Sequence, residues 1–322
     1  MVTNARYLLL FLAVCLSAQT NFFAGRLVAD AHHCYPNEGR WSNRLDRALS
    51  IGFPVAIEQD LAWSVDHIVV SHTPRTTGAE PSLKQYFFER VRPIVEKALQ
   101  ENKRETWPII ILHFDFKDNQ PALLHAVWNL LGEYESWITT AQKNANPAVL
   151  APFDPKPLLV LTEDSDAQEE VFFKEVPAGA RLRLFGSAHT TPIQDNHLLV
   201  TLPPERLLTA PPTNYRRWWN NSWYVVEEGG AAHAGDWTPA DQARLRSLAD
   251  YAHRLGYWIR FYTLDGFTSA EDQGWGAGYN FGSEAAVRLR WQAARDAQVN
   301  LIATDQYEAL GAFLSSRARG VE

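Results

Sequence analysis

Two acidic residues stand inside an apolar stretch of this sequence, PVAIEQDLAW at residues 54–63. The stretch has the composition of a buried β-strand, and Glu58 and Asp60, at positions i and i+2, would point to the same face of it. Two carboxylates side by side in a protein interior are unfavourable unless a positive charge lies between them. The sequence therefore predicts a metal ion or a basic side chain next to Glu58 and Asp60.

A third acid and a lysine have the same spacing further along the chain. The residues HFDFK place Asp115 and Lys117 at i and i+2 near the end of another apolar stretch. Three carboxylates are hard oxygen ligands, which suit Mg²⁺ or Ca²⁺ better than Zn²⁺. We expect Glu58, Asp60 and Asp115 to bind such an ion. The alternative is a set of salt-bridged strand ends, with Lys117 or Arg260 as the counter-charge.

Histidines flank these acids along the chain. His32 and His33 end the apolar stretch 26–33, and His72 follows the acidic stretch in HIVVSH. The usual pKa range of histidine suits one of them as a general base and another as a general acid. The sequence alone does not choose between His32 and His33.

Two basic residues and a tyrosine complete the candidate site. Lys117 and Arg260 are expected to hold phosphate oxygens of a substrate, unless they only balance the acids. Tyr262 follows Arg260 at i+2 in YWIRFYTLDG and is expected beside the substrate.

Apolar stretches alternate with helical patterns along the chain. Strands are predicted over residues 26–33, 54–63, 108–117, 157–164, 181–188, 222–228, 257–266 and 299–305. Continuous apolar strands separated by helices indicate a parallel sheet covered on both faces. The count predicts an α/β fold, a single-domain (β/α)8 TIM barrel over residues 25–322, with a doubly wound open sheet as the alternative. In such a barrel the functional groups meet at the carboxyl ends of the strands.

Three segments between or beside these strands carry their own predictions. A helix is expected from Pro239 to Gly256, with Thr238 as its N-cap. The aromatic residues 214–224 could contact a membrane surface or an apolar substrate, or form core and the start of a strand. The loop 267–283 could form a lid or apolar rim over the site, or be an ordinary long barrel loop.

The composition and the N-terminal residues limit the class of protein to which the chain can belong. The formal net charge is −7 and no Lys/Arg-rich block occurs, which argues against nucleic-acid binding. Residues 1–24 have the basic start and short apolar run of a signal peptide, with a cleavage site near Ala18, so we expect a secreted, periplasmic or cell-surface protein. Cys34 is then the single remaining cysteine, which excludes an internal disulfide. We expect a monomer.

In their order along the chain, these residues resemble the phospholipase C-like phosphodiesterase superfamily of TIM barrels. That group includes glycerophosphodiester phosphodiesterases, sphingomyelinase D-like enzymes and phosphatidylinositol-specific phospholipases. The resemblance covers about residues 26–315. His32 matches the histidine that ends the first strand, Glu58 and Asp60 match the E-x-D of the second, and His72 matches the second histidine. The D-x-K of Asp115 and Lys117 is similar to the sphingomyelinase D-like pattern.

The resemblance implies a metal-dependent phosphoric diester hydrolase acting on a small-molecule or lipid phosphodiester, such as a phospholipid or glycerophosphodiester. His32 and His72 would be the acid and base, the three carboxylates the ligands of Mg²⁺ or Ca²⁺, and Lys117 a phosphate contact. The H-R-G and P-E-N-T signatures of the glycerophosphodiesterases are absent, and AHHCYPNEG stands in their place. Two other functions stay open: a non-catalytic exported binding protein, and a glycoside hydrolase using acids such as Glu163 and Glu227.

Overall fold

Parallel hydrogen bonding joins the apolar stretches into a sheet that closes on itself. The computed structural model describes residues 23, 26–37, 39–268, 270–271 and 277–316. Eight parallel strands form the barrel: β1 (Val28–Ala31), β2 (Val55–Ser64), β4 (Ile110–Phe116), β7 (Leu158–Thr162), β9 (Phe185–Ser187), β10 (Arg216–Ser222), β11 (Trp258–Tyr262) and β12 (Leu301–Thr304). Because β1 pairs with both β2 and β12, the ring is closed. The predicted (β/α)8 barrel is confirmed, and the open-sheet alternative is wrong.

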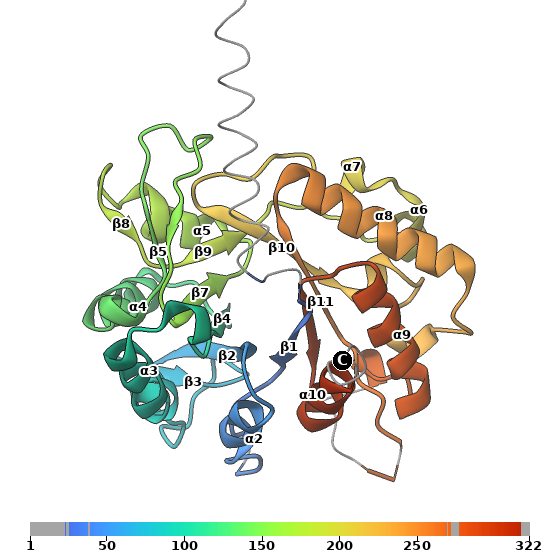
Figure 1. Ribbon diagram of the computed structural model, residues 1–322, viewed down its shortest axis with the longest axis horizontal. Coiled ribbons are helices and arrows are strands. Elements are labelled where there is room, and N and C mark those ends of the chain that lie inside the picture. The colour runs from blue at the N-terminus through green and yellow to red at the C-terminus, as the bar shows by residue number, and fades with distance from the viewer. Residues whose placement is uncertain (1–22, 24–25, 38, 269, 272–276, 317–322) are drawn as a thin grey trace, which may run out of the picture.

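Helices surround this ring on its outside, as Figure 1 shows. They are α2 (Arg44–Ser50), α3 (Glu89–Glu101), α4 (Pro121–Glu133), α5 (Asp166–Glu169), α6 (Asn196–Thr201), α7 (Pro204–Leu207), α8 (Pro239–Leu255), α9 (Glu284–Asp296) and α10 (Tyr307–Ser315). Two π-helical segments, η1 (Lys84–Phe88) and η4 (Glu170–Lys174), adjoin α3 and α5. Short 3₁₀ turns are η2 (Arg104–Thr106), η3 (Glu135–Trp137), η5 (Trp223–Val225), η6 (Ala231–His233) and η7 (Ala277–Tyr279).

Four short strands lie outside the ring. β3 (His67–Val70) folds back on β2 as an antiparallel hairpin and leads directly to His72. β5 (Thr140–Gln142), β6 (Phe153–Asp154) and β8 (Arg181–Leu182) form a separate antiparallel sheet. None of the helices in the described ranges combines the length and the apolar character needed to span a bilayer.

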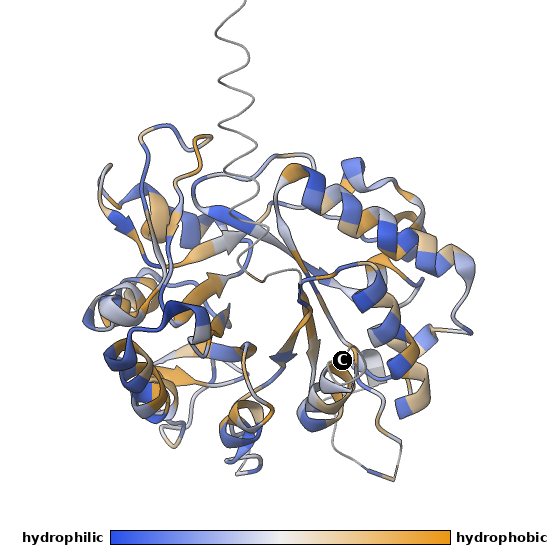
Figure 2. Ribbon diagram, in the orientation of Figure 1, coloured by the Kyte–Doolittle hydropathy of each residue, from blue (hydrophilic) through white to orange (hydrophobic). Residues whose placement is uncertain are grey.

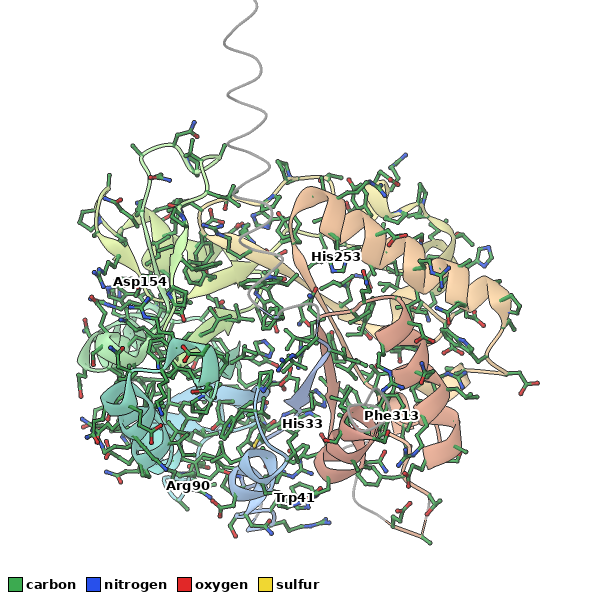
Figure 3. All side chains as sticks on the ribbon, in the orientation of Figure 1. His33, Trp41, Arg90, Asp154, His253 and Phe313 are labelled. Carbon is green, nitrogen blue, oxygen red and sulfur yellow. The ribbon has the colours of Figure 1, made fainter. Side chains whose placement is uncertain are left out.

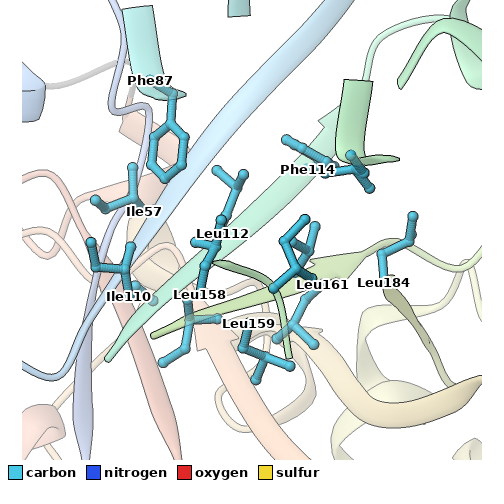
Figure 4. Packing of buried hydrophobic residues seen from close by; sticks show 14 of the residues in the cluster. Ile57, Phe87, Ile110, Leu112, Phe114, Leu158, Leu159, Leu161 and Leu184 are labelled. Atoms are coloured by element: carbon cyan, nitrogen blue, oxygen red, sulfur yellow. The ribbon is translucent and has the colours of Figure 1, made fainter. Parts of the chain in front are cut away.

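Alternation along β2 and β4 decides which side chains face the site. Ile57, Leu112 and Phe114 are fully buried and pack with Phe87 of η1, on the helix side of the sheet (Figure 4). Successive side chains of a strand point to opposite faces, so Glu58, Asp60, His113 and Asp115 point the other way, to the inside of the barrel. In Figure 2 the ribbons of β4 and β7 are mainly apolar, whereas β10 is mainly hydrophilic and the outer helices are mixed.

The sixth strand is placed differently from the prediction. Residues 216–222 form β10, whereas 223–225, inside the predicted range 222–228, form a 3₁₀ turn. Ser222 starts this turn by accepting a hydrogen bond from the Tyr224 N–H, which competes with strand pairing. The aromatic residues Trp218, Trp219 and Trp223 are fully buried, which agrees with the alternative of core and strand start.

The predicted helix after Thr238 is confirmed as α8. The Thr238 hydroxyl accepts from the Asp241 N–H, and the Asp241 carboxylate accepts from the Thr238 N–H at 2.9 Å, a complete capping box. Gly256 ends the helix at φ 95°, a left-handed conformation that favours glycine. The expected signal peptide, residues 1–24, lies outside the described residues apart from Phe23, which is buried against Trp258.

Candidate functional site at the barrel mouth

The strand register brings the three predicted acidic ligands together. Asp60 of β2 stands opposite Asp115 of β4, and Glu58 stands opposite His113. One possible ligand oxygen from each of Glu58, Asp60 and Asp115 lies within 4.8 Å of the others. The triad expected from the sequence therefore exists as a cluster at the carboxyl ends of two neighbouring strands, where TIM barrels carry their sites.

Asp60 is the most firmly held of the three acids. Its Oδ2 accepts from the Tyr35 hydroxyl at 2.6 Å, contacts His72 Nδ1 at 2.9 Å and pairs with Lys117 Nζ at 2.7 Å. Its Oδ1 is buried and has no hydrogen-bond partner within the described part of the chain. One oxygen is thus fixed by the protein while the other is left for a ligand.

Lys117 links Asp60 to Asp115. Its Nζ lies 2.7 Å from an oxygen of each carboxylate. The side chain of Asp115 is 36% exposed, and burial together with the charge of Asp60 raises the pKa of Asp115 to about 6. Burial alone would lower the pKa of Lys117, but the two carboxylates raise it above its usual value. Lys117 is therefore a counter-charge in this structure, as the salt-bridge alternative predicted.

Arg260 has the same relation to Glu58. It is 1% exposed and donates to Glu58 through Nη2, to Asp30 through Nε at 2.5 Å, and to the Asn220 amide oxygen through Nη1 at 2.9 Å. Burial would raise the pKa of Glu58, but His32 and Arg260 hold it well below its usual range. Since all three guanidinium nitrogens bind protein groups, the structure places Arg260 as a support of Glu58. Its contact with a substrate stays a prediction.

His32 also lies against the acidic cluster. Its Nε2 is 3.6 Å from Glu58 Oε1, and its Nδ1 is 3.4 Å from Asp305 Oδ1. Burial would lower the pKa of His32, but Glu58 and Asp305 raise it to about 9. His33, labelled in Figure 3 next to β1, lies 3.1 Å from the same Asp305 oxygen, and burial and His32 lower its pKa.

His72 approaches from the β3 side of the mouth. Its side chain is 40% exposed, and its contact with Asp60 uses Nδ1. A carboxylate on Nδ1 orients the ring and leaves proton exchange with a ligand to Nε2. Both predicted histidines, His32 and His72, are therefore brought to the cluster, the first buried and the second accessible.

His113 is a further member of the site that is not among the residues predicted from the sequence. It lies between two acids, with Nε2 2.6 Å from Glu163 and Nδ1 3.4 Å from Glu58. Burial and Arg260 lower its pKa, but Glu163 and Glu58 raise it to about 9. The signal was present, because His113 precedes Asp115 and Lys117 at the same two-residue spacing.

Two tyrosines border the histidines. The ring centre of Tyr262, predicted to contact the substrate, lies 6.2 Å from that of His32. The ring of Tyr279 lies 5.6 Å from His32 and 5.7 Å from His33. Tyr279 belongs to the loop expected as a lid or rim, of which residues 269 and 272–276 lie outside the described residues.

The two acids of the glycosidase alternative have separate surroundings. Glu163 accepts from the Asn220 amide at 2.8 Å beside His113. Glu227 is buried, pairs with Arg290 at 2.6 Å and accepts from the Trp223 indole at 2.7 Å. Glu227 therefore acts in a structural ion pair of the outer core.

The donor set fits a hard divalent cation. Three carboxylates supply oxygen ligands, and Asp60 Oδ1 is a buried acceptor that no described residue satisfies. Buried polar atoms without a partner are rare in folded proteins and call for an explanation. Mg²⁺ or Ca²⁺ bound by these oxygens, with water or a ligand completing the shell, provides one.

Likeness to known proteins is found among solved structures. No family model matches the chain, and no curated protein matches it. A triple mutant of Plasmodium falciparum HPPK-DHPS with pteroate matches with a TM-score of 0.48 and 11% identity, covering 92% of this chain and 49% of that one. An HPPK-DHPS in complex with substrates matches with a TM-score of 0.45 and 13% identity, with coverages of 92% and 49%. The chain thus spans about half the length of these proteins.

These comparisons correct the functional prediction. A phosphoric diester hydrolase of lipid metabolism was expected, whereas the matched structures are those of HPPK-DHPS. We therefore withdraw the phosphodiesterase prediction and its phospholipid or glycerophosphodiester substrate. The physical reason is that acids, histidines and a lysine at strand ends can serve many ligands on one barrel fold, so their order does not specify a reaction. At these identities the likeness assigns no ligand to this chain.

Proposed function

We propose that the mouth of the barrel binds a divalent cation, Mg²⁺ or Ca²⁺, together with a small oxyanion ligand. Glu58, Asp60 and Asp115 would hold the cation. The observation that carries the proposal is the convergence of these three carboxylates within 4.8 Å, with Asp60 Oδ1 buried and unpartnered in the described structure. A bound cation would supply positive charge to the oxygens of the ligand.

The charge balance of the cluster supports an additional cation. Glu58 is compensated by Arg260 and by His32, whose pKa of about 9 keeps it protonated near neutral pH. Asp60 and Asp115, in contrast, share the one ammonium group of Lys117. Burial opposes an excess of negative charge, so a further cation at this place is electrostatically favoured.

The same arrangement would allow proton exchange with the bound ligand. His72 is accessible, and Asp60 orients it through Nδ1. His32 lies beside Glu58 and Asp305. A ligand held between these two imidazoles would meet one ring that Asp60 orients and one that Asp305 supports.

The test is calorimetric titration of Mg²⁺ and of Ca²⁺ into the full chain and into Asp115→Asn. Asp115 is the least buried of the three acids, so its amide variant is the one least expected to disturb folding. We expect one site in the native protein and a loss of affinity of about tenfold or more in the variant. Asp166→Asn is the matched control, because Asp166 is 89% exposed and belongs to a separate cluster with Glu169 and His189. Absence of binding by the folded native protein, or equal weakening by both variants, would overturn the proposal.

A further inference from the structure

Lys117 occupies the space between two of the carboxylates that the proposed cation would use. Its Nζ is 2.7 Å from Asp60 Oδ2 and 2.7 Å from Asp115 Oδ2. An ammonium group and a divalent cation would repel each other at this range. Lys117 and the cation therefore compete for the same negative charge.

The main chain at Lys117 is fixed, so only the side chain can move. The Lys117 N–H donates to the Leu61 carbonyl at 2.9 Å, which continues the pairing of β4 with β2 past the last strand residue. The flexible four-carbon stem of lysine lets its ammonium group change position while the main chain stays in register. Departure of Nζ would leave the strand ends unchanged.

The carboxylates that Lys117 leaves would remain satisfied. Asp60 Oδ2 keeps the Tyr35 hydroxyl at 2.6 Å and His72 at 2.9 Å. Asp115 is 36% exposed, so water can replace the lost contact. The contrast is Arg260, whose departure would take a buried cation away from both Asp30 and Glu58. Of the two counter-charges at the mouth, Lys117 is the one that can be displaced at low cost.

We propose that Lys117 is a tethered cation that the divalent ion displaces, and that its released ammonium group then binds the oxyanion. This rests on the proposed function and adds an order of binding: the anion binds only after the cation has freed Lys117. While Lys117 is paired with Asp60 and Asp115, its charge is compensated and attracts an anion weakly. Once freed, it would add a charged hydrogen-bond donor beside the cation.

Amine-selective acetylation with peptide mass spectrometry tests the displacement directly. In the native protein, Mg²⁺ is expected to raise the acetylation of Lys117 severalfold, since its ammonium group leaves the two carboxylates. Lys84, which pairs with Glu133 at 2.6 Å on the surface, is the matched control and should be unaffected. Unchanged or lower acetylation of Lys117, at Mg²⁺ concentrations that saturate the calorimetric site, would overturn the inference.

Titration of Lys117→Met provides the second measurement. Without the competing ammonium group, Mg²⁺ should bind about tenfold more tightly, which corresponds to about 1.4 kcal/mol. Sulfate, the oxyanion probe, should bind the native protein only in the presence of Mg²⁺ and should fail to bind the variant. Sulfate binding to the native protein without Mg²⁺, or to the variant, would contradict the inference. It would not contradict the proposed cation site. If neither protein binds Mg²⁺, the proposed function itself fails.

Discussion

At the scale of single residues, the buried pair of Arg260 with Asp30 and Glu58 dominates the inner layer of the barrel mouth. We expect Arg260→Met to lower the free energy of unfolding by about 3–5 kcal/mol, because it removes the buried cation that pairs with Asp30 and with Glu58. Urea unfolding measures the change. Arg288→Met is the control, since Arg288 pairs with Glu284 at 2.6 Å on the surface and should contribute about 0–1 kcal/mol. Similar losses in the two variants would contradict this account.

A second residue-scale prediction concerns Asp265, whose Oδ1 accepts from the Thr304 hydroxyl and from the Asp305 N–H, both at 2.7 Å. Burial, and then the charge of Asp305, raise the pKa of Asp265 to about 7 from 3.8. The folded protein therefore holds this proton where the unfolded chain releases it, so stability falls as the pH rises from about 4 to about 7. The loss from this group is at most about 4 kcal/mol.

Asp265→Asn removes this titration. Compared with the native protein, the variant should gain stability at pH 8 relative to pH 5, as measured by unfolding in urea at both values. Thr304→Val serves as a control, since it removes the hydroxyl donor and keeps the carboxyl group. A pH-independent difference between Asp265→Asn and the native protein would show that Asp265 is ionised in the fold at both values.

Sequence spacing predicted the residues of the cluster better than their partners. The predicted residues do come together, because alternation along a strand is a local rule and a barrel gathers the strand ends at one mouth: Glu58, Asp60, Asp115, Lys117, His32 and His72. The sharing of Lys117 between two acids, and of His113 between Glu58 and Glu163, depends on strand register. Register is set by contacts between distant segments, which spacing along one strand does not reveal.

At the scale of elements, the start of α8 is set by residues next to it in the sequence. Thr238→Ala removes the side-chain acceptor for the Asp241 N–H and should lower the free energy of unfolding by about 1 kcal/mol. Thr238→Ser keeps the hydroxyl and should remain near native stability. Thermal unfolding of the two variants compares them, and an equal loss in both would point away from the capping hydrogen bond.

Elements whose local signals conflict were predicted less well. The segment SWYVVEE is rich in strand-forming residues, yet Ser222 begins a 3₁₀ turn there. The observed strand, RRWWNNS, begins with two arginines, which are polar and do not indicate a buried strand. Arg216 is nevertheless buried, with Glu169 at 2.6 Å and Asp164 at 2.7 Å as partners. Tertiary ion pairs thus override the propensity of the segment.

At the scale of the whole molecule, closure of the ring is what assembles the mouth. β1 must meet both β2 and β12, and His33 and Asp305, which touch, are 272 positions apart in the sequence. Arg44 reaches the same carboxylate across 261 positions. The sequence could predict the number of strands, whereas these contacts required the closed ring.

The closure of β1 on β12 has a consequence for how the protein is made. Until β12 has been synthesised, one edge of β1 has no partner strand. His33 also lacks its contact with the Asp305 carboxylate. Long-range pairing of this kind is slow, and open strand edges promote association between chains. The candidate site at the mouth can therefore assemble only after β12 has been synthesised and has paired with β1.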